Sequence, residues 1–361
     1  MMKICFIETT WPHNSRTERF KESFRQEGNE IISIGWKRDL RSVAIDGNSF
    51  VKESIIGYGK PIKKLMLLGS FLLHSVNVIK SQRPDVLFMV HWDSLLIGMV
   101  CNFILRKKMV LVYDCLDMPT AKNRLVNIIL LRLDTFLARK CDLVFFASRY
   151  FPEFYGIKES RECVFENYPS RKIVMKVTDA DYLIKELPVD KKIISWLGVV
   201  RYFSVLKNLI DAVRNDETVH LCFFGDGPDL DRVIAYINNE NITNVRTYGR
   251  YKFEDIGTIY KYSDLIWAAY PTDDFNVKYA ISNKYFECNF FEKKPIFSKN
   301  TMIYHAIGDS GSALFVDEKS VDSIKMALSR SDDCFNRYEP VKFWEDEFKR
   351  IGELLNSTIK R

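Results

Sequence analysis

Short apolar runs alternate with longer segments of helical periodicity through the first half of the chain. Because these runs are apolar throughout, with no alternation of polar and apolar positions, they are typical of strands in a parallel sheet that helices cover on both faces. The predicted strands are Lys3–Ile7, Glu30–Ile34, Val86–Val90, Val110–Tyr113, Leu143–Ala147 and Cys163–Glu166.

The same pattern restarts after a charged, proline-containing stretch from Val174 to Lys192. It predicts a second Rossmann-like domain that begins near residue 190. The strands expected there are Ile193–Leu197, Val219–Phe224, Val245–Tyr248, Leu265–Ala269, Pro295–Ser298 and Ala313–Val316.

The fold class is therefore predicted to be α/β, since 361 residues exceed one typical core and suffice for two. Residues 1–175 form the first domain and residues 190–340 the second. Residues 341–361 form a C-terminal helix, with an apolar face that includes Trp344 and Phe348, which packs back toward the first domain.

Charge and cysteine usage narrow the functional classes. Lys and Arg total 53 against 47 Asp and Glu, a net charge of +6 that suits anionic ligands or an anionic membrane surface and is too small to indicate nucleic acid. The eight cysteines stand singly in mostly apolar runs, as buried, reduced thiols of a cytosolic protein do.

Targeting and membrane-spanning segments are not expected. The N-terminal apolar run is a first strand and too short for a signal peptide. The most apolar windows, Leu65 to Ile79 and Ser94 to Leu105, fall short of the ~20 residues that cross a bilayer. Core packing and peripheral membrane docking both explain the basic cluster at Lys60–Lys64 and the apolar helix that follows it.

The first group of candidate residues follows the first strand of the second domain. Gly198 and Arg201 come after that strand, and Lys207 stands six residues beyond Arg201. Two cations in a water-poor site would stabilise the charge that develops on a departing diphosphate. Taken alone, such a pair is more often solvated surface.

Two further groups follow later strands. Gly225 and Gly227 in Phe224–Pro228 permit a tight turn with backbone close to a ligand, although an ordinary turn has the same composition. Ser282, Asn283 and Lys284 precede a predicted helix, whose N-terminal amides suit a phosphate, and Glu287 could accept ribose hydroxyls.

These groups, in this order, resemble the nucleotide-binding half of retaining glycosyltransferases of the GT-B fold, family 4. The resemblance covers residues 193–317 well and the first domain loosely. It implies that Arg201 and Lys207 contact the donor diphosphate and that Glu287 binds ribose. Val245–Arg250, with Tyr248 and Arg250, resembles the family's base-binding segment.

The chain departs from the family pattern at two positions, one where a glutamate is expected and one where a histidine is expected. Tyr279 replaces the first glutamate of the usual pair, so the donor sugar stays open, with Asn276, Asp273 and Asp274 as nearby polar substitutes. Leu116 replaces the family's histidine.

In the first domain, polar residues after the strands are the remaining candidates. Asp114 and Asp117 follow the fourth strand, and His91, which Asp93 would orient, follows the third. The loop after the first strand contains no glycine, and His13 or Arg16 would line the acceptor side.

The resemblance thus implies a retaining hexosyltransferase that moves a sugar from a UDP- or GDP-sugar to a glycan or lipid-linked glycan, in surface polysaccharide biosynthesis. No metal or nucleic acid is expected, and the location is cytoplasmic or at the inner membrane face. The alternatives are a sugar-nucleotide epimerase of the same architecture and a non-catalytic nucleotide-sugar-binding protein. A nicotinamide-dependent oxidoreductase is disfavoured because no Gly-x-Gly-x-x-Gly follows the first strand.

Overall fold

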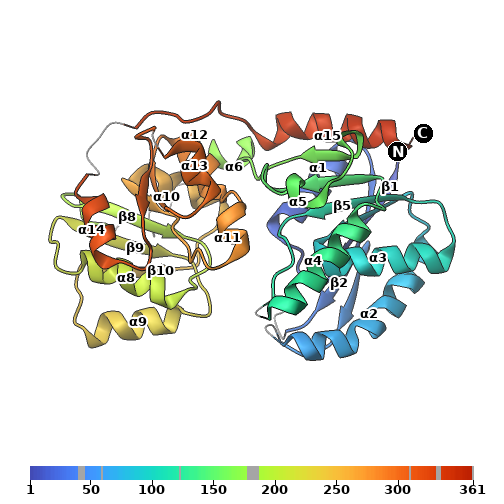
Figure 1. The fold of residues 1–361 in the computed structure, drawn as a ribbon, viewed down its shortest axis with the longest axis horizontal. Coiled ribbons are helices and arrows are strands. Elements are labelled where there is room, and N and C mark those ends of the chain that lie inside the picture. Colours follow the sequence, from blue (N-terminus) through green and yellow to red (C-terminus); the bar gives the residue numbers. More distant parts are fainter. Residues whose placement is uncertain are drawn as a thin grey trace. The chain divides into compact units, whose positions relative to one another are not determined.

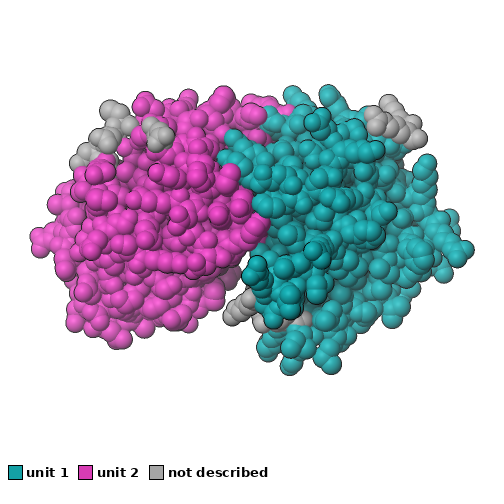
Figure 2. Space-filling view, in the orientation of Figure 1, with its two compact units in different colours: residues 1–166, 347–361 teal, residues 167–346 magenta. Residues whose placement is uncertain are grey.

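The computed structural model describes residues 1–39, 45–57, 60–121, 123–176, 187–308, 310–330 and 335–359. The chain divides into two compact units (Figures 1 and 2). The first comprises Met1–Glu166 and Glu347–Arg361, and the second comprises Asn167–Asp346.

The first unit is built on a seven-stranded parallel sheet with the order β3-β2-β1-β4-β5-β6-β7. The reversal of strand order beside β1 is the arrangement of a Rossmann-like sheet. The strands are β1 (Lys3–Glu8), β2 (Glu30–Lys37), β3 (Ser49–Glu53), β4 (Val86–Val90), β5 (Val110–Cys115), β6 (Leu143–Phe146) and β7 (Glu162–Val164).

Helices cover this sheet, and three of them, α2, α3 and α4, lie side by side in Figure 1, with α3 in contact with both of the others. α3 packs on β4, which is buried along its whole length, and α2 packs on β2 and on the edge strand β3. The helices of the unit are α1 (Ser15–Gln26), α2 (Pro61–Gln82), α3 (His91–Leu105), α4 (Arg124–Ala138), α5 (Pro152–Tyr155) and the 3-10 helix η1 (Glu159–Arg161).

The second unit repeats the design with a six-stranded parallel sheet in the order β10-β9-β8-β11-β12-β13. Its strands are β8 (Lys192–Leu197), β9 (Val219–Phe224), β10 (Val245–Gly249), β11 (Leu265–Trp267), β12 (Lys294–Ser298) and β13 (Leu314–Val316). Its helices are α6 (Arg171–Val174), α8 (Phe203–Val213), α9 (Leu230–Asn239), η2 (Phe253–Asp255), α10 (Ile256–Tyr262), α11 (Phe275–Tyr279), α12 (Asn283–Phe291), α13 (Met302–Ile307) and α14 (Val321–Leu328).

The predicted α/β class with two Rossmann-like domains is confirmed, and each predicted strand overlaps an observed one. The sequence missed β3, the edge strand, because its side chains are half-buried or exposed and give no continuous apolar run. Part of the predicted linker, residues 177–186, lies outside the described residues.

Residues 167–175, assigned to the first domain by the sequence, belong to the second unit. Long-range hydrogen bonds explain the difference. The Trp344 amide donates to the Pro169 carbonyl at 3.0 Å, and the Ser170 hydroxyl donates to Glu345 at 2.5 Å. These contacts tie the segment to residues close to the C-terminus, which no local pattern reveals.

The C-terminal helix α15 (Trp344–Ile359) belongs to the first unit from Glu347 onward. The ring of Phe348 packs edge-on against Phe24 of α1, with centroids 4.8 Å apart. The seven described cysteines are buried thiols, and Cys334 lies outside the described residues.

Among the described residues, one helical segment, Ile62–Gln82 of α2, is long and apolar enough to cross a membrane by length and composition alone. The sequence underestimated this segment because the helix extends past the apolar window at both ends. Phe71, Val78 and Ile79 of α2 are buried in the first unit, so one face of the helix belongs to the core.

Candidate functional site

Two loops at the carboxyl edge of the second sheet pack directly on each other. Gly198 follows β8, and its amide donates to the Phe224 carbonyl at 2.9 Å. Two residues on, the Val200 amide donates to the Asp226 carbonyl at 3.0 Å, and the Val200 carbonyl accepts from the Asp229 amide at 3.1 Å. The backbones of the β8–α8 and β9–α9 loops therefore form one rigid platform.

The glycines of this platform are required by the contact between the loops. Gly225 has a φ of +139°, and a Cβ atom there would lie 1.8 Å from the Gly198 oxygen. A Cβ on Gly227 would lie 2.2 Å from the Val200 oxygen. The sequence attributed these glycines to close approach of a ligand, whereas in the structure each already meets backbone of the neighbouring loop.

Lys284 reaches this platform from α12. Ser282 caps the helix by accepting from the Lys284 amide at 3.3 Å, so that Asn283 and Lys284, which the sequence placed just before the helix, lie in its first turn. The Lys284 Nζ atom lies 3.8 Å from the position that a Cβ would take on Gly198, whose φ is +115°. A cation and the N-terminus of a helix thus lie together beside the β8–α8 loop.

The surroundings of Lys284 favour its charged form. Burial lowers the pKa of this half-buried amine, but Tyr270, Glu287 and Tyr251 together raise it above the usual value for lysine. The amine is therefore a fixed positive charge at any physiological pH. The two tyrosines were missed by the sequence reasoning because they follow different strands and share no motif with Lys284.

Glu287 lies one turn beyond Lys284 on α12. Its Oε2 atom accepts a hydrogen bond from the Tyr260 hydroxyl at 2.7 Å. Tyr260 is fully buried and stacks on Phe291, with ring centroids 4.6 Å apart. A half-buried carboxylate is therefore held in one orientation by a rigid partner, which suits the predicted recognition of hydroxyl groups.

Arg201 and Lys207, predicted to converge, have different partners. The exposed Arg201 guanidinium lies over the Tyr202 ring at 4.7 Å. Lys207 pairs with Asp211 at 2.5 Å and lies over the Tyr236 ring of α9 at 4.8 Å. The hydrogen bond that Lys207 donates to Asp211 is the main cause that raises the pKa of Lys207.

The helix register explains why the expected pairing is not among the described contacts. α8 begins at Phe203, so Lys207 stands in its second turn, where its i+4 neighbour is Asp211. In this register the Lys207 side chain lies toward α9, and its contact with a diphosphate stays a prediction.

The predicted base-binding segment lies beside the platform. Tyr248 stacks on Phe224, with ring centroids 4.8 Å apart. The exposed Arg250 pairs with Asp226 at 2.7 Å, and this hydrogen bond lowers the pKa of Asp226. The Gly225 amide donates to the Gly249 carbonyl at 2.7 Å, which joins this segment to the β9–α9 loop.

The polar substitutes for the missing glutamate lie around α11. Asp274 caps that short helix by accepting from the Asn276 amide at 2.9 Å. Asp273 pairs with Lys319 at 2.6 Å, and both side chains are exposed. The roles of Asn276, Asp273 and Asp274 toward a sugar stay predictions.

In the first unit, His91 begins α3 directly after β4, with a φ of +66°. The neighbouring Asp93 is buried and bonded to other residues, accepting from the Thr9 hydroxyl at 2.7 Å and pairing with Lys64 of α2. Burial raises the pKa of Asp93, but Lys64 and then His91 lower it by more, so that it stays below the usual value.

Lys64 and Thr9 therefore join His91 at the carboxyl edge of the first sheet. The sequence missed Lys64 because this residue lies on α2 and not in a loop that follows a strand. The Lys64 amine also donates to the Thr9 hydroxyl, at 2.9 Å. Among the contacts described, His91 and Asp93 interact only electrostatically, and no hydrogen bond between them holds His91 in the expected orientation.

The remaining first-domain candidates divide into buried and exposed residues. Asp117 is exposed after β5, whereas Asp114 is fully buried and forms a bidentate ion pair with Arg16, with a shortest distance of 2.9 Å. Arg16 is itself 2% exposed, so neither residue lines a solvent-facing surface. The expectation that Arg16 lines an acceptor site is therefore wrong, because its charge is satisfied inside the core.

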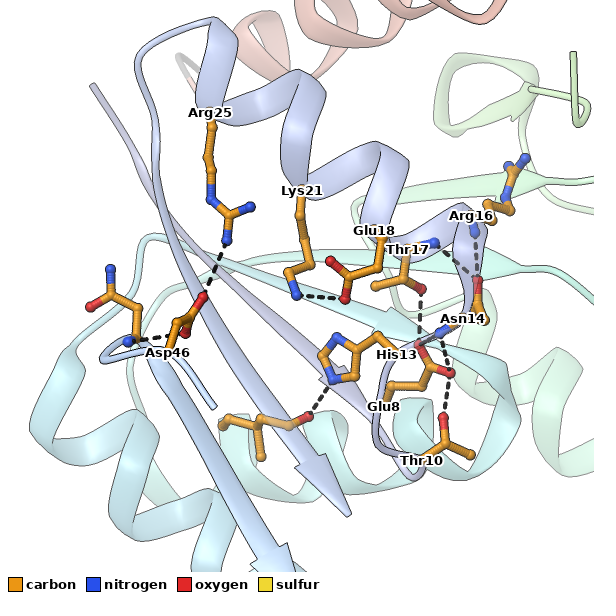
Figure 3. A network of polar contacts seen from close by, with 12 residues as sticks. Glu8, Thr10, His13, Asn14, Arg16, Thr17, Glu18, Lys21, Arg25 and Asp46 are labelled. Atoms are coloured by element: carbon orange, nitrogen blue, oxygen red, sulfur yellow. Dashed lines mark hydrogen bonds and ion pairs between the residues drawn. The ribbon is translucent and has the colours of Figure 1, made fainter. Parts of the chain in front are cut away.

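His13 is also internal. One ring nitrogen lies 3.2 Å from the Ile34 carbonyl (Figure 3), and burial lowers the pKa of the side chain to about 3. A histidine held neutral and buried is a structural group, which corrects its predicted role on the acceptor side.

The β1–α1 loop is held by a buried carboxylate where the resembled family has glycines. Glu8 accepts from the Thr10 hydroxyl at 2.5 Å, from the Thr17 hydroxyl at 2.9 Å and from the Asn14 amide at 3.2 Å (Figure 3). Asn14 in turn caps α1. The loop is therefore fixed by side-chain hydrogen bonds.

Among the described residues, no group of three or more His, Cys, Asp or Glu side chains could hold a metal ion. The independence from metal stays a prediction.

The chain is similar to known proteins in its structure and not in its sequence. No protein-family model matches the sequence, and neither does any curated protein. Among solved structures, sucrose-phosphate synthase from Thermosynechococcus elongatus superposes with a TM-score of 0.77 at 12% identity, over 99% of each chain.

Two further structures show the same fold. Anabaena HepE in complex with UDP and glucose has a TM-score of 0.71 at 15% identity, over 99% of this chain and 100% of that one. A Listeria monocytogenes protein with an unproven assignment as a UDP-N-acetylglucosamine 2-epimerase has a TM-score of 0.65 at 14% identity, over 99% of this chain and 97% of that one. The chain has the GT-B fold, as the sequence predicted.

Proposed function

We propose that this protein is a glycosyltransferase that takes a sugar from a nucleotide diphosphate donor, UDP- or GDP-linked. The observation that carries the proposal is the placement of Lys284, a half-buried and permanently charged amine, beside the backbone platform of Gly198 and Gly225. Fixed cations and amides of this kind stabilise a departing diphosphate better than water does.

Each part of the donor has a candidate partner in the second unit. The diphosphate would be bound by Lys284, by the N-terminal amides of α12 and by Arg201, with Lys284 taking the place first predicted for Lys207. Glu287, held by Tyr260, would accept hydroxyl groups of the ribose. The segment around Tyr248 and Arg250 would contact the base.

The finer assignment follows from the sequence resemblance. The sugar is a hexose, transferred with retention of configuration to a hydroxyl of a glycan or lipid-linked glycan in surface polysaccharide biosynthesis, in the cytoplasm. The first unit supplies the acceptor site, with His91 and Asp117 as its candidate polar groups. His91 lies where the first sheet ends, the edge at which open α/β sheets bind ligands.

Calorimetry with UDP, GDP and ADP tests the proposal. The wild-type protein should bind UDP or GDP, and Lys284→Gln should weaken binding by at least about tenfold, since a charge-assisted contact in a half-buried site contributes roughly 1.5–3 kcal/mol. Lys325→Gln, on the exposed face of α14, is the matched control and should bind as the wild type does. Absence of binding for every nucleotide would overturn the proposal.

An epimerase is the second candidate, because one structure of the same fold is described as a UDP-N-acetylglucosamine 2-epimerase. NMR of UDP-sugars incubated with the protein separates the candidates. Release of UDP on addition of an acceptor indicates transfer, and a new UDP-sugar epimer indicates epimerisation. Binding without either product would identify the non-catalytic alternative.

A further inference from the structure

The helix α4 of the first unit presents apolar side chains to solvent. Its inner face carries Asp134, Leu137 and Ala138, all buried, while its outer face carries the exposed residues. Ile129, for example, is 63% exposed. These outer side chains recur at helical spacing and form one stripe: Leu125, Val126, Ile128, Ile129 and Phe136.

The helix α2 shows the same arrangement at its outer face. Met66 is 78% exposed, and Ile62, Leu65 and Leu73 are exposed with it. Only 22% of the most apolar 18-residue window of this helix is buried. The stripe on α2 therefore lacks a partner among the described residues, although the opposite face packs in the core.

The helix α3 lies between α2 and α4 and contributes at its C-terminal end. Phe103 is 82% exposed, and Ile104 beside it is exposed as well. We call the exposed side chains of these three helices the apolar face: Ile62, Leu65, Met66, Leu73, Phe103, Ile104, Leu125, Val126, Ile128, Ile129 and Phe136. So many exposed apolar side chains on adjacent helices mark an interaction surface.

The exposed charges within the three helices have one sign. The acidic residues within the three helices are Asp93 and Asp134, and both are buried. The exposed basic residues are Lys63 and Lys80 on α2, Arg106, Lys107 and Lys108 after α3, and Arg124, Arg132, Arg139 and Lys140 on or after α4. An exposed apolar surface with a basic border complements a surface that is apolar beneath and negatively charged above.

We propose that the apolar face docks onto an anionic phospholipid membrane, with the three helices lying in the interface. Apolar side chains would enter the boundary between headgroups and acyl chains, and the basic border would bind the headgroups. α2 lies on the membrane and does not span it, because Phe71, Val78 and Ile79 hold its other face in the core. This docking goes beyond the proposed transferase activity and stands without it.

A second copy of the chain is a poorer occupant than a membrane. In a symmetric dimer the same patch meets itself, so the basic border of one copy would face that of the other. Like charges brought together at an interface oppose association. The net excess of Lys and Arg over the chain acts in the same direction.

Vesicle sedimentation tests the proposal on the full chain. The wild-type protein should pellet with vesicles of phosphatidylcholine and phosphatidylglycerol, bind pure phosphatidylcholine vesicles several-fold more weakly, and be partly released by high salt. Met66→Glu and Ile129→Glu should each lower the partition coefficient by at least about tenfold. Lys107→Glu with Lys108→Glu should lower it by roughly fivefold for each charge removed.

Met326→Glu is the matched control, because Met326 is half-exposed on α14 of the second unit and should leave vesicle binding unchanged. Each variant is compared for UDP or GDP affinity and for unfolding midpoint, so that loss of vesicle binding in a folded, nucleotide-binding protein supports the docking. Failure of the wild type to pellet with anionic vesicles overturns it. Equal pelleting of the wild type and Ile129→Glu would also overturn it. So would a wild-type dimer that binds no vesicles and that Ile129→Glu separates into monomers.

Discussion

The Nζ atom of Lys284 lies 3.8 Å from the point where a side chain would begin on Gly198. The two residues are 86 positions apart in the sequence, one in the loop after β8 and one in the first turn of α12. Their proximity brings a lysine, a helix N-terminus and the hydrogen-bonded backbone of the β8–α8 loop to a single point. The predictions for nucleotide binding start from this relationship.

Lys284 and Lys207 should differ in their effect on the diphosphate. We expect Lys284→Met to weaken the binding of UDP or GDP by at least about tenfold. The same substitution should change the binding of uridine or guanosine little, since the nucleosides carry no phosphate. Lys207→Met should change both affinities by less than about threefold, because its amine is engaged by Asp211. Calorimetry with paired ligands gives the ratio, and the reverse ranking would restore Lys207 as the diphosphate contact.

Glu287 should recognise ribose hydroxyls. We expect Glu287→Ala to weaken the binding of UDP or GDP by roughly tenfold, because a hydrogen bond from the ribose to a charged acceptor is lost. The effect should largely disappear when deoxyribose nucleotides are used, since the variant and the ligand then lack the same contact. A full effect with the deoxy ligand would instead assign Glu287 to the structure of α12.

Gly225→Ala should destabilise the second unit by about 2–4 kcal/mol, because the new Cβ would overlap the Gly198 oxygen and the φ of +139° disfavours any side chain. Urea unfolding measures this loss. Gly69→Ala in α2 is the control. No described atom lies within 4 Å of its Cβ position, so helix propensity should raise stability by about 0.5–1 kcal/mol. Equal effects of the two substitutions would contradict the close packing of the loops.

Asp114 should be structural rather than catalytic. We expect Asp114→Asn to lower the free energy of unfolding by about 3–5 kcal/mol, because it leaves the Arg16 guanidinium buried without its counter-ion. The double variant Arg16→Met, Asp114→Leu should recover most of that loss, since it removes both charges. Inactivity of Asp114→Asn at unchanged stability would return Asp114 to the candidate catalytic residues.

Asp134 should make stability depend on pH. It is fully buried, bonded by Tyr113 at 2.8 Å and by Tyr155, and burial raises its pKa from 3.8 to about 6. The folded state therefore binds this proton more tightly than the unfolded state does, so the stabilisation present at low pH is lost as the pH rises through about 6.

The raised pKa of Asp134 corresponds to about 3 kcal/mol. The melting temperature of the wild type, relative to that of Asp134→Asn, should fall between pH 4 and pH 7. Thermal unfolding of both proteins across this range isolates the contribution from other carboxylates. Parallel curves would show that Asp134 does not titrate there.

The pattern of apolar runs alone determined the strands other than β3 and their assignment to two parallel sheets. This was possible because strands buried on both faces must be apolar throughout, whatever contacts they make. A helix after Ser282 was also predicted, and its observed cap is a local contact, since Ser282 accepts from the amide two residues later. The sequence did not predict the edge strand β3, because an exposed edge strand has no continuous apolar run. Nor did it predict that residues 167–175 belong to the second unit, because a hydrogen bond across 175 positions leaves no local pattern.

Only the tertiary structure decided which charges face one another. Lys207 and Arg16 looked available for substrates, but helix register paired the first with Asp211, and burial paired the second with Asp114. Lys284 gained its place from the packing of α12 beside Gly198, and Lys64 reached Asp93 from a distant helix. Burial pattern is a property of each segment, whereas the neighbours of a charged side chain depend on several segments at once. For this reason the sequence determined the fold, and the three-dimensional arrangement selected the residues of the site.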